Sequence, residues 1–544
     1  MLLEPWLRFL LVALLAAMAA AQDQVGPLPV GFTRHWSLDF ARSYDTTFAD
    51  GSTYAGGHRA PRPVLVEVWY PAAPAADATP MRRGDYLDVA TSDARLAPFA
   101  RALEAYAKGV VADEVLDKKA DERGPDDEAA LAAVLAAPAH AVRDAPPLGV
   151  RNPLVLYHAG YGSSYEDNVA FCERLASHGY VVASSAWQQA DGASFNIDSR
   201  DGSIADLAFL VDELARRPDV DAAHLGLVGH SGGAHMAYRA QARPQAPWDA
   251  LVLLDTTQDY WSVREPRWTH VADALAAIPN FRVPMLVCAD RNAIFDLADR
   301  LTSADRWYLT FRQLGHNSFI EHGVMGLELA ARRAAAAPAT DGQPSTADDD
   351  ARIERAGFDH LCRTARLFLD AQLKGDPSAA AALAAEAAAS APGDVESRLE
   401  HVPPGVAGPP AWDPAGDAPP EPRQLRGALA TLGAAELVKR MDAWHAAQPN
   451  LPIFSRLFGL SLSWELVDGG RLDEARVVAP FYGRINPEGA GVDLWFVKLS
   501  SKPGREAWKT SMLQSALLMS PDNAEVKAAW EAWQAEQAKA AAAH

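Results

Sequence analysis

The feature that most constrains the fold of this 544-residue chain is a serine flanked by glycines, Gly229-His230-Ser231-Gly232-Gly233. A mostly apolar run at 225–228 precedes it, and a helix-like segment at 234–242 follows. This order of strand, turn and helix is the context in which G-x-S-x-G forms a nucleophile elbow, with the serine strained and its hydroxyl exposed at the sheet edge. The outer glycines would let strand and helix approach closely. A chance match to so short a pattern is common, but the flanking elements favour the elbow. The sequence therefore predicts that Ser231 is the nucleophile of a serine hydrolase.

Apolar runs bounded by turn residues recur along the first three quarters of the chain and alternate with helix-like segments. Strands are expected at 63–71, 152–157, 180–184, 225–228, 250–254, 284–288 and 307–311, and helices at 167–178, 203–214, 234–242 and 353–373. Such alternation indicates a mainly parallel sheet with helices on both faces. Functional groups then gather at the carboxyl ends of the strands. The predicted fold class is α/β, an α/β-hydrolase fold followed by a smaller all-α C-terminal domain.

The N-terminal residues 1–21 are typical of a signal peptide. An apolar run of 13 residues, 9–21, follows a weakly positive start and ends in small residues before Gln22. Thirteen apolar residues are too few to cross a bilayer. We therefore expect an exported protein, periplasmic or secreted, with no transmembrane segment.

Composition divides the remaining chain into three parts. We expect a hydrolase domain at 22–400, a proline-rich linker at 401–423 and a helical domain at 424–544. Within the first part, residues 81–150 interrupt the strand–helix alternation with charged, alanine-rich helical stretches. We interpret them as an insertion that could roof an active site as a lid.

The C-terminal part carries a weak internal repeat. Gly470-Arg471 recurs as Gly504-Arg505, and Pro487 recurs as Pro521, both with an offset of 34 residues. This is the period of tetratricopeptide repeats. The pattern is compatible with two degenerate repeats packed on the hydrolase domain. It is equally compatible with a free module that binds a protein partner.

Charge and cysteine content exclude several functions. A formal net charge of −20 argues against binding to nucleic acid or to an anionic membrane surface. The three cysteines, Cys172, Cys288 and Cys362, have no spacing that suits a metal or a disulfide framework, and we expect buried free thiols. Neither a metal nor an organic cofactor is expected.

A serine nucleophile needs a base, usually a histidine held by a carboxylate. The base should follow the last strand of the sheet, and His316 lies in the loop after the strand that ends at Phe311. His322 lies six residues further on, within the next element. His230, inside the elbow, should point away from the serine. We therefore assign His316 as the base.

The acid has three candidates, which are Asp255, Asp290 and Asp296. The loop after the strand at 284–288 usually carries the acid in α/β-hydrolases, but here Asn292 stands at the usual position and Asp290 lies close to the strand end. Asp255 ends the strand directly after the elbow, from where a carboxylate can reach the same histidine. We favour Asp255.

The tetrahedral intermediate needs backbone N–H donors. Gly232, directly after the nucleophile, should supply one. The second should come from the loop after the strand at 152–157, where Gly160 and Gly162 let the backbone approach closely. Tyr161 is the predicted second donor.

Together these segments resemble the platelet-activating factor acetylhydrolase family, which lies within the α/β-hydrolases and is similar to dienelactone hydrolases. The resemblance spans about 60–375 and rests on 66–71, 158–162, 175–179, the elbow at Ser231, 254–255 and 315–319. It implies Asp255 as acid, His316 as base and Tyr161 as oxyanion donor. The chain departs from the family in the extra Ala159, in the insertion and in the C-terminal repeats. Serine instead of cysteine at the elbow argues against dienelactone hydrolase chemistry.

These features predict an exported carboxylic ester hydrolase that works through an acyl-enzyme. Small-molecule and lipid esters are candidate substrates, including short-acyl and phospholipid-type esters. Two alternatives stay open: an amide or peptide hydrolase on the same fold, and a tetratricopeptide-type binding or scaffold protein with a vestigial hydrolase domain.

Overall fold

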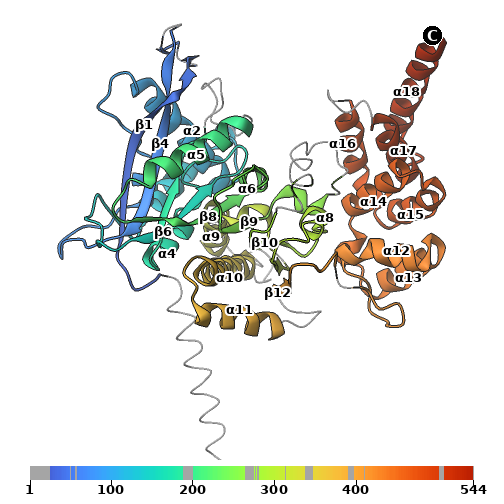
Figure 1. Ribbon diagram of the computed structural model, residues 1–544. Helices are drawn as coiled ribbons and strands as arrows, with labels where there is room; N and C mark the ends of the chain where they lie inside the picture. The colour runs from blue at the N-terminus through green and yellow to red at the C-terminus, as the bar shows by residue number, and fades with distance from the viewer. Residues whose placement is uncertain are drawn as a thin grey trace, which may run out of the picture. The chain divides into compact units, whose positions relative to one another are not determined.

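The structure is a computed structural model (Figure 1). It describes residues 25–542 except for gaps at 49–50, 56–57, 188–199, 262, 264–274, 276, 278–280, 313, 337–346, 390–396, 410 and 502–507. The predicted signal peptide lies outside the described residues. Within the described ranges, no helix is long and apolar enough to cross a membrane.

The chain forms two compact units. The first comprises Met1–Thr256, Pro279–Asp290 and Ser303–Pro404, and the second comprises Thr257–Ile278, Arg291–Thr302 and Gly405–His544. Two segments from within the range expected for the hydrolase domain are therefore grouped with the C-terminal helices. Each of these segments follows a strand of the first unit directly in sequence.

In the described part of the chain, ten strands of the first unit form one sheet, in the order β12-β11-β10-β9-β8-β6-β7-β4-β1-β5 (Figure 1). The six central strands, from β11 to β7, pair in parallel, whereas β4, β1 and β12 add antiparallel edges. The strands are β1 (Val30–Tyr44), β4 (Ala60–Pro71), β5 (Ala141–Arg143), β6 (Asn152–His158), β7 (Val181–Ser184), β8 (Val220–His230), β9 (Ala250–Leu254), β10 (Met285–Asp290), β11 (Arg306–Phe311) and β12 (Ser397–Val402). Each strand expected from the sequence is present. A separate hairpin pairs β2 (Thr46–Thr47) with β3 (Thr53–Tyr54).

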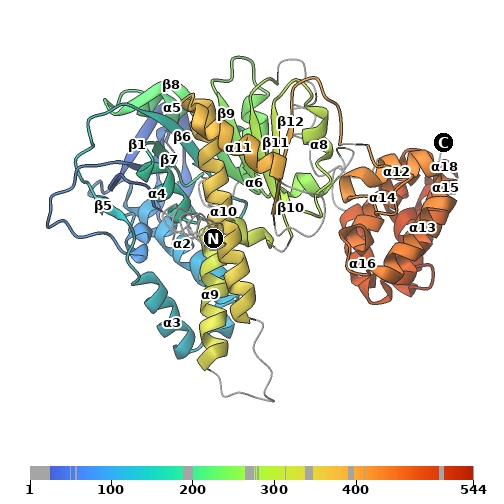
Figure 2. The same ribbon diagram turned by 90° about the horizontal axis from the view of Figure 1, so that it is seen from below.

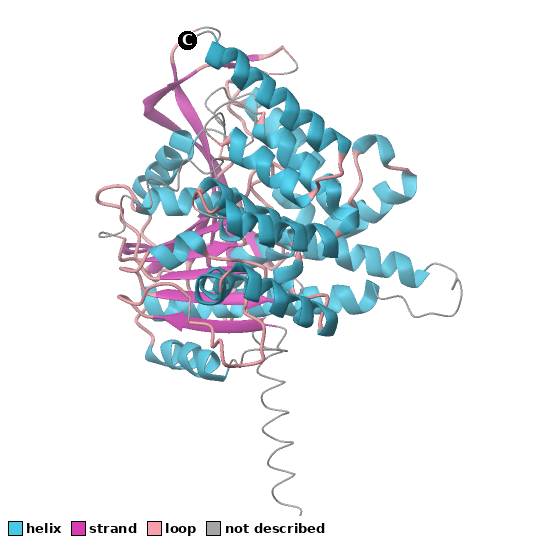
Figure 3. Cartoon of the chain, turned by 90° about the vertical axis from the view of Figure 1, so that its right-hand side faces the viewer, coloured by secondary structure: helices cyan, strands magenta, loops and turns pink. Residues whose placement is uncertain are grey.

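Helices cover both faces of the sheet (Figure 3). On one face, α4 (Val169–Ser177) and α10 (Ala347–Leu373) pack on the strands and on each other. On the other, α5 (Arg200–Leu214) packs beside α6 (Gly232–Gln241), which contacts β6, β8 and β9. Because the central strands are buried on both faces, they are almost continuously apolar. The predicted α/β-hydrolase fold, followed by a helical C-terminal region, is confirmed.

The insertion at 81–150 contains η1 (Arg83–Leu87), α2 (Ala97–Leu116), η2 (Ala120–Glu122), α3 (Pro125–Leu135) and β5. Its helix α2 packs on α9 (Glu321–Ala336), which runs side by side with α10 (Figure 2). Leu103, Val111 and Val115 of α2 are buried against Met325 and Leu329 of α9. The insertion is therefore joined by an apolar core to the helix that follows His316.

The second unit is a helical assembly with its own apolar core. Its described helices are η3 (Thr257–Tyr260), α8 (Asp296–Arg300), η6 (Pro422–Gln424), α12 (Leu425–Leu432), α13 (Ala434–Ala447), η7 (Pro452–Phe454), α14 (Arg456–Asp468), α15 (Leu472–Ile485), η8 (Pro487–Gly489), α16 (Ala490–Ser500), α17 (Lys509–Met519) and α18 (Ala524–Ala542). Trp261 and Ile294, from the two earlier segments, belong to this core together with Trp464. The remaining first-unit elements are η5 (His316–Phe319) and α11 (Pro377–Ala389).

The proline-rich segment expected as a linker at 401–423 begins in β12 and ends in η6, and its described residues between them are loop. From Gly405 onward it belongs to the second unit. Trp412 donates from its indole N–H to the carbonyl of Ala418 at 3.0 Å, and its ring meets Trp444 edge-on, 5.8 Å between centroids. Of the repeated residues, Gly504 and Arg505 lie outside the described residues. The tetratricopeptide period stays a prediction.

Candidate active site

Ser231 occupies a strained turn between β8 and α6. Its φ of 50° and ψ of −113° fall in a region that residues with a side chain rarely adopt, as expected at a nucleophile elbow. Its backbone N–H donates to the carbonyl of Leu254 at 2.9 Å, which holds the turn against the end of β9. A Cβ on Gly229 would lie 2.3 Å from the backbone of Gly233, and one on Gly233 would lie 2.0 Å from the carbonyl oxygen of His158. The two outer glycines are therefore needed for close backbone approach.

The glycine-rich loop after β6 passes directly over the elbow. A Cβ on Gly160 would lie 3.0 Å from Nδ1 of His230 and 3.2 Å from Cβ of Ser231. The ring of Tyr161 covers Gly232, where a Cβ would lie 2.4 Å from Cδ2 of the ring. The two residues predicted to supply oxyanion donors thus lie against each other beside Ser231. Tyr161 is 38% exposed, so one face of its ring reaches solvent.

His316, at the start of η5, is oriented by Asp255. Its Nδ1 lies 2.5 Å from Oδ2 of Asp255. Because a carboxylate only accepts hydrogen bonds, Nδ1 carries the proton and Nε2 of the neutral ring is left as the basic nitrogen. The carboxylate is buried, whereas the His316 side chain is 40% exposed. A base with one protected and one accessible face is suited to proton transfer at a substrate.

Asp255 is held in place by the neighbouring strand. Its backbone N–H donates to the carbonyl of Cys288 at 2.7 Å, and its φ of 42° turns the chain out of β9. The other carboxylate oxygen, Oδ1, accepts from the backbone N–H of Asp290 at 3.4 Å. Asp290 therefore contacts Asp255 through its backbone N–H. The third candidate, Asp296, accepts from Nε of Arg300 at 2.9 Å.

His230 links the elbow to the base. Its Nε2 donates to the carbonyl of His316 at 3.2 Å, and the two rings lie 4.8 Å apart. Burial and the neighbouring His316 lower the pKa of His230 well below its usual value. His230 is therefore neutral, and it does not oppose the positive charge that His316 gains when it accepts a proton. From the motif alone, His230 was expected only to point away from the serine. Its contact with His316 could not be predicted from the motif.

A second buried imidazole lies under the glycine-rich loop. The ring of His158 stacks on Trp187, 3.9 Å between centroids and 15° between planes. Its Nδ1 lies 2.9 Å from the carbonyl oxygen of Ala159, so it carries the proton. Burial lowers the pKa of His158 to about 4. This residue supports the loop as a neutral, hydrogen-bonded ring.

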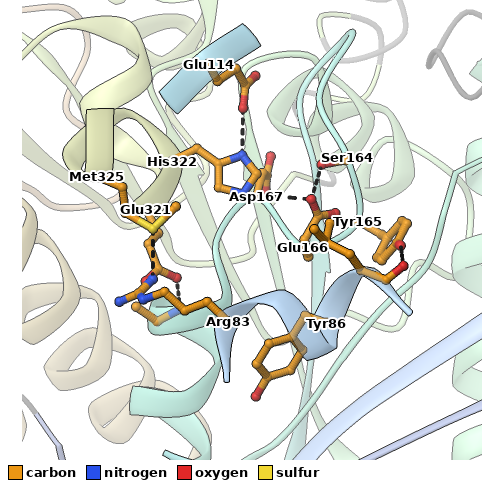
Figure 4. Close-up of polar contacts among 12 residues, drawn as sticks. Arg83, Tyr86, Glu114, Ser164, Tyr165, Glu166, Asp167, Glu321, His322 and Met325 are labelled. Carbon is orange, nitrogen blue, oxygen red and sulfur yellow. Dashed lines mark hydrogen bonds and ion pairs between the residues drawn. The ribbon is translucent and has the colours of Figure 1, made fainter. Parts of the chain in front are cut away.

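A buried ionisable cluster that was not predicted lies behind the site (Figure 4). Glu166 and Asp167 follow the glycine-rich loop, His322 lies in the first turn of α9, and Glu114 lies in α2. Burial raises the pKa of Glu166 to about 7 and that of Asp167 to about 7. The sequence signal that could have pointed to this cluster is the acidic pair Glu166-Asp167, shortly after the glycine-rich loop. The partner on α2 was not predictable, because it comes from the insertion.

In the described residues, no group of three or more His, Cys, Asp and Glu side chains is arranged to hold a metal ion. The three cysteines are buried and free. What the arrangement offers is a strained serine with the oxyanion loop packed against its elbow, and a histidine hydrogen-bonded to a buried carboxylate. These are the groups that nucleophilic acyl transfer requires.

No protein-family model matches the sequence, and no curated protein matches it significantly. Among solved structures, a ferulic acid esterase from Streptomyces cinnamoneus is similar. The likeness covers 64% of this chain and 92% of the esterase, with 19% sequence identity and a TM-score of 0.39.

Proposed function

We propose that this protein is a serine-dependent carboxylic ester hydrolase. The observation that carries the proposal is the hydrogen bond between Asp255 and His316. The strained Ser231 is joined to both, because its N–H donates to Leu254, next to Asp255, and the adjacent His230 donates to the carbonyl of His316. A carboxylate, an imidazole and a serine in these positions form the acid–base–nucleophile set of acyl transfer. A fold alone would not support this conclusion, since the same fold carries many activities.

The reaction follows from the roles of the three side chains. Oγ of Ser231 attacks the ester carbonyl carbon while Nε2 of His316 accepts the hydroxyl proton, and Asp255 stabilises the resulting imidazolium. The N–H groups of Gly232 and Tyr161 hydrogen-bond the carbonyl oxygen as it becomes negative. The C–O bond to the alcohol then breaks, and His316 returns the proton to the departing alcohol. Water repeats these steps on the acyl-enzyme and releases the acid.

The proposed substrate class follows from the resemblance to platelet-activating factor acetylhydrolases and remains part of this proposal. Short-acyl and phospholipid-type esters are the first to test. Export to the periplasm or the medium is proposed from residues 1–21 alone. An amide would pass through the same type of intermediate, so amides belong in the substrate test. A protein partner for the C-terminal helices also stays a prediction.

The test is hydrolysis of p-nitrophenyl esters from acetate to palmitate by the purified protein, with a p-nitroanilide in parallel. We expect turnover of esters that Ser231→Ala abolishes. Ser378→Ala is a matched control, because Ser378 lies at the exposed start of α11 and hydrogen-bonds only with Asp376 among the contacts described. Ester turnover that persists in Ser231→Ala would rule the proposal out.

A further inference from the structure

Two segments, one that follows the proposed oxyanion loop and one that carries the proposed base, are hydrogen-bonded to each other behind the site. One is 163–170, which continues from the oxyanion loop. The other is 316–322, which begins at the base. Three hydrogen bonds join them: His322 N to the carbonyl of Asp167 at 3.3 Å, Asn168 Nδ2 to the carbonyl of Phe319 at 3.4 Å, and Ala170 N to Oε2 of Glu321 at 2.6 Å. A displacement of either segment would therefore move the other.

The side chain of His322 connects these segments to the insertion. Its Nδ1 lies 2.7 Å from Oε2 of Glu114 on α2, and its Nε2 lies 3.8 Å from Oε1 of Glu166 (Figure 4). The same Oε1 of Glu166 accepts from the hydroxyl of Ser164 at 2.8 Å. His322 and Glu166 are buried, whereas the side chain of Glu114 is 20% exposed. A single ring thus lies between a carboxylate of α2 and a carboxylate of the 163–170 segment.

The 163–170 segment is also tied to the strand that leads into the oxyanion loop. The hydroxyl of Tyr157, one residue before the end of β6, donates to Oδ1 of Asp167 at 2.8 Å. Both ends of the glycine-rich loop are therefore fixed through Asp167. The position of Tyr161 relative to Ser231 depends on these attachments.

The arrangement favours a charged imidazole. Nδ1 of His322 hydrogen-bonds the carboxylate of Glu114, and Nε2 faces the carboxyl group of Glu166 at 3.8 Å, so only the imidazolium presents an N–H to both. Burial acts against this charge, but the hydrogen bond and charge of Glu114, with the charges of Glu166 and Asp167, raise the pKa of His322 above its usual value. Breaking one partner of a buried ion pair is strongly destabilising, because it leaves the other charge uncompensated.

Other ionisable groups line a small cavity that His322 and Glu166 also line. Arg83 and Tyr86 come from η1, and Glu321 comes from α9. Arg83 pairs with Glu321. Tyr106 of α2 is also affected by this cluster, since burial and the charges of Glu114 and Glu166 raise its pKa to about 12. Among these groups, Glu114 is the carboxylate that comes from the insertion and bonds directly to His322.

We propose that Glu114 is a positioning residue for the active site: through the His322 imidazolium it holds segments 163–170 and 316–322 in the arrangement that places the oxyanion loop and the base around Ser231. This inference rests on the proposed function. It gives the insertion a role as a support of the catalytic loops, in addition to any part in covering the site.

The test compares Glu114→Gln with Glu104→Gln. Both residues lie on α2, but Glu104 pairs with Lys108 on the exposed side of the helix. Glutamine keeps the shape of Glu114 and removes its charge, so His322 should lose its proton at a lower pH. Hydrogen exchange followed by mass spectrometry at pH 6, 7.5 and 9 measures the two segments directly, and ester hydrolysis across the same range measures kcat and KM.

In Glu114→Gln we expect exchange in 163–170 and 316–322 to rise together, most strongly at pH 9. We expect kcat at pH 8 to fall about tenfold, with KM changed less than about twofold and the alkaline limb of the pH profile moved about one unit lower. Glu104→Gln should match the wild type. Unchanged exchange in both segments, or faster exchange confined to α2, would overturn the proposal.

The exchange measurement separates this inference from the proposed function, because it needs no substrate. Absence of ester hydrolysis in the wild type would refute the function while leaving the exchange result to be judged by itself. If Glu114→Gln fails to fold, the wild type alone provides the test. After correction for the intrinsic rates, exchange of the two segments must rise together with pH, and independent behaviour would refute the link.

Discussion

Oδ2 of Asp255 lies 2.5 Å from Nδ1 of His316, although the two residues are 61 positions apart in sequence. Asp255 directly follows β9, and His316 begins η5 after β11, so the sheet brings together residues that follow two strands separated by β10. Their hydrogen bond fixes the tautomer of the imidazole and leaves Nε2 basic.

Asp255→Asn should lower kcat by about 10⁴ while the fold persists, because the amide no longer favours the tautomer that the base needs. The measurement is kcat for a p-nitrophenyl ester at equal folded yield, checked by circular dichroism. Asp290→Asn is the matched control, since Asp290 contacts Asp255 through its backbone N–H. If Asp290→Asn were the inactive variant, our assignment of the acid would be wrong.

His230→Leu should lower kcat about tenfold, because it removes the donor to the carbonyl of His316 and leaves that acceptor without its partner. His230→Gln should retain most of the activity, since its amide nitrogen can occupy nearly the position of Nε2. Steady-state kinetics and thermal melts of both variants test this. Equal losses in the two variants would mean that the hydrogen bond is not what matters at this position.

Gly160→Ala should reduce kcat by about tenfold or more. The new Cβ would press on His230 and Ser231 and displace the oxyanion loop, and small misplacements are costly in acyl transfer. Gly109→Ala, in the interior of α2 with open space around its Cα, serves as the control. It should keep full activity and raise the free energy of unfolding by about 0.5–1 kcal/mol. A fully active Gly160→Ala would contradict the close approach of the loop to the elbow.

Stability should depend on pH through the cluster behind the site. Glu166 and Asp167 have pKa values of about 7 in the folded protein, against about 4 in an unfolded chain, because burial disfavours their charged forms. The folded state then binds more protons between about pH 4 and pH 7, so this contribution to the free energy of unfolding declines as pH rises through that range. The pKa of His322 is also raised, so its contribution is lost in the same direction.

Glu166→Gln mimics the protonated carboxyl and should remove part of this dependence. Thermal melts from pH 5 to pH 8 should show the Tm of the variant improving relative to the wild type as pH rises. Glu104→Gln, at a partly exposed site where Glu104 pairs with Lys108, should show a constant difference. A Tm difference for Glu166→Gln that does not change with pH would contradict a raised pKa at this residue.

The central sheet was predictable because its strands are buried on both faces and therefore read as apolar runs. The long strand β1, between β4 and the short edge strand β5, was not predicted. It is only partly buried and carries charged residues such as Arg34 and Asp39, so its pattern does not resemble that of the inner strands. Short β5 and β12 pair at the sheet edges and likewise gave no apolar run.

The site was predictable where the chemistry depends on position at the end of a strand. Ser231, Asp255 and the oxyanion loop each follow a strand directly, and His316 lies five residues beyond the last residue of β11. The link from Glu114 to His322 spans 208 positions and depends on how the insertion folds, so no local pattern encodes it. The burial of Trp261 and Ile294 is likewise not encoded locally, because both residues pack in an apolar core formed mainly by the C-terminal helices.

The most direct measurement of the central claim is labelling with a fluorophosphonate, followed by intact-mass and peptide mass spectrometry. We predict one adduct per wild-type molecule, located on Ser231, and none on Ser231→Ala. The rate of labelling should fall strongly in Asp255→Asn, because His316 then no longer activates the serine. An adduct on another residue, or a wild-type protein that stays unlabelled while correctly folded, would contradict the assignment of Ser231 as the nucleophile.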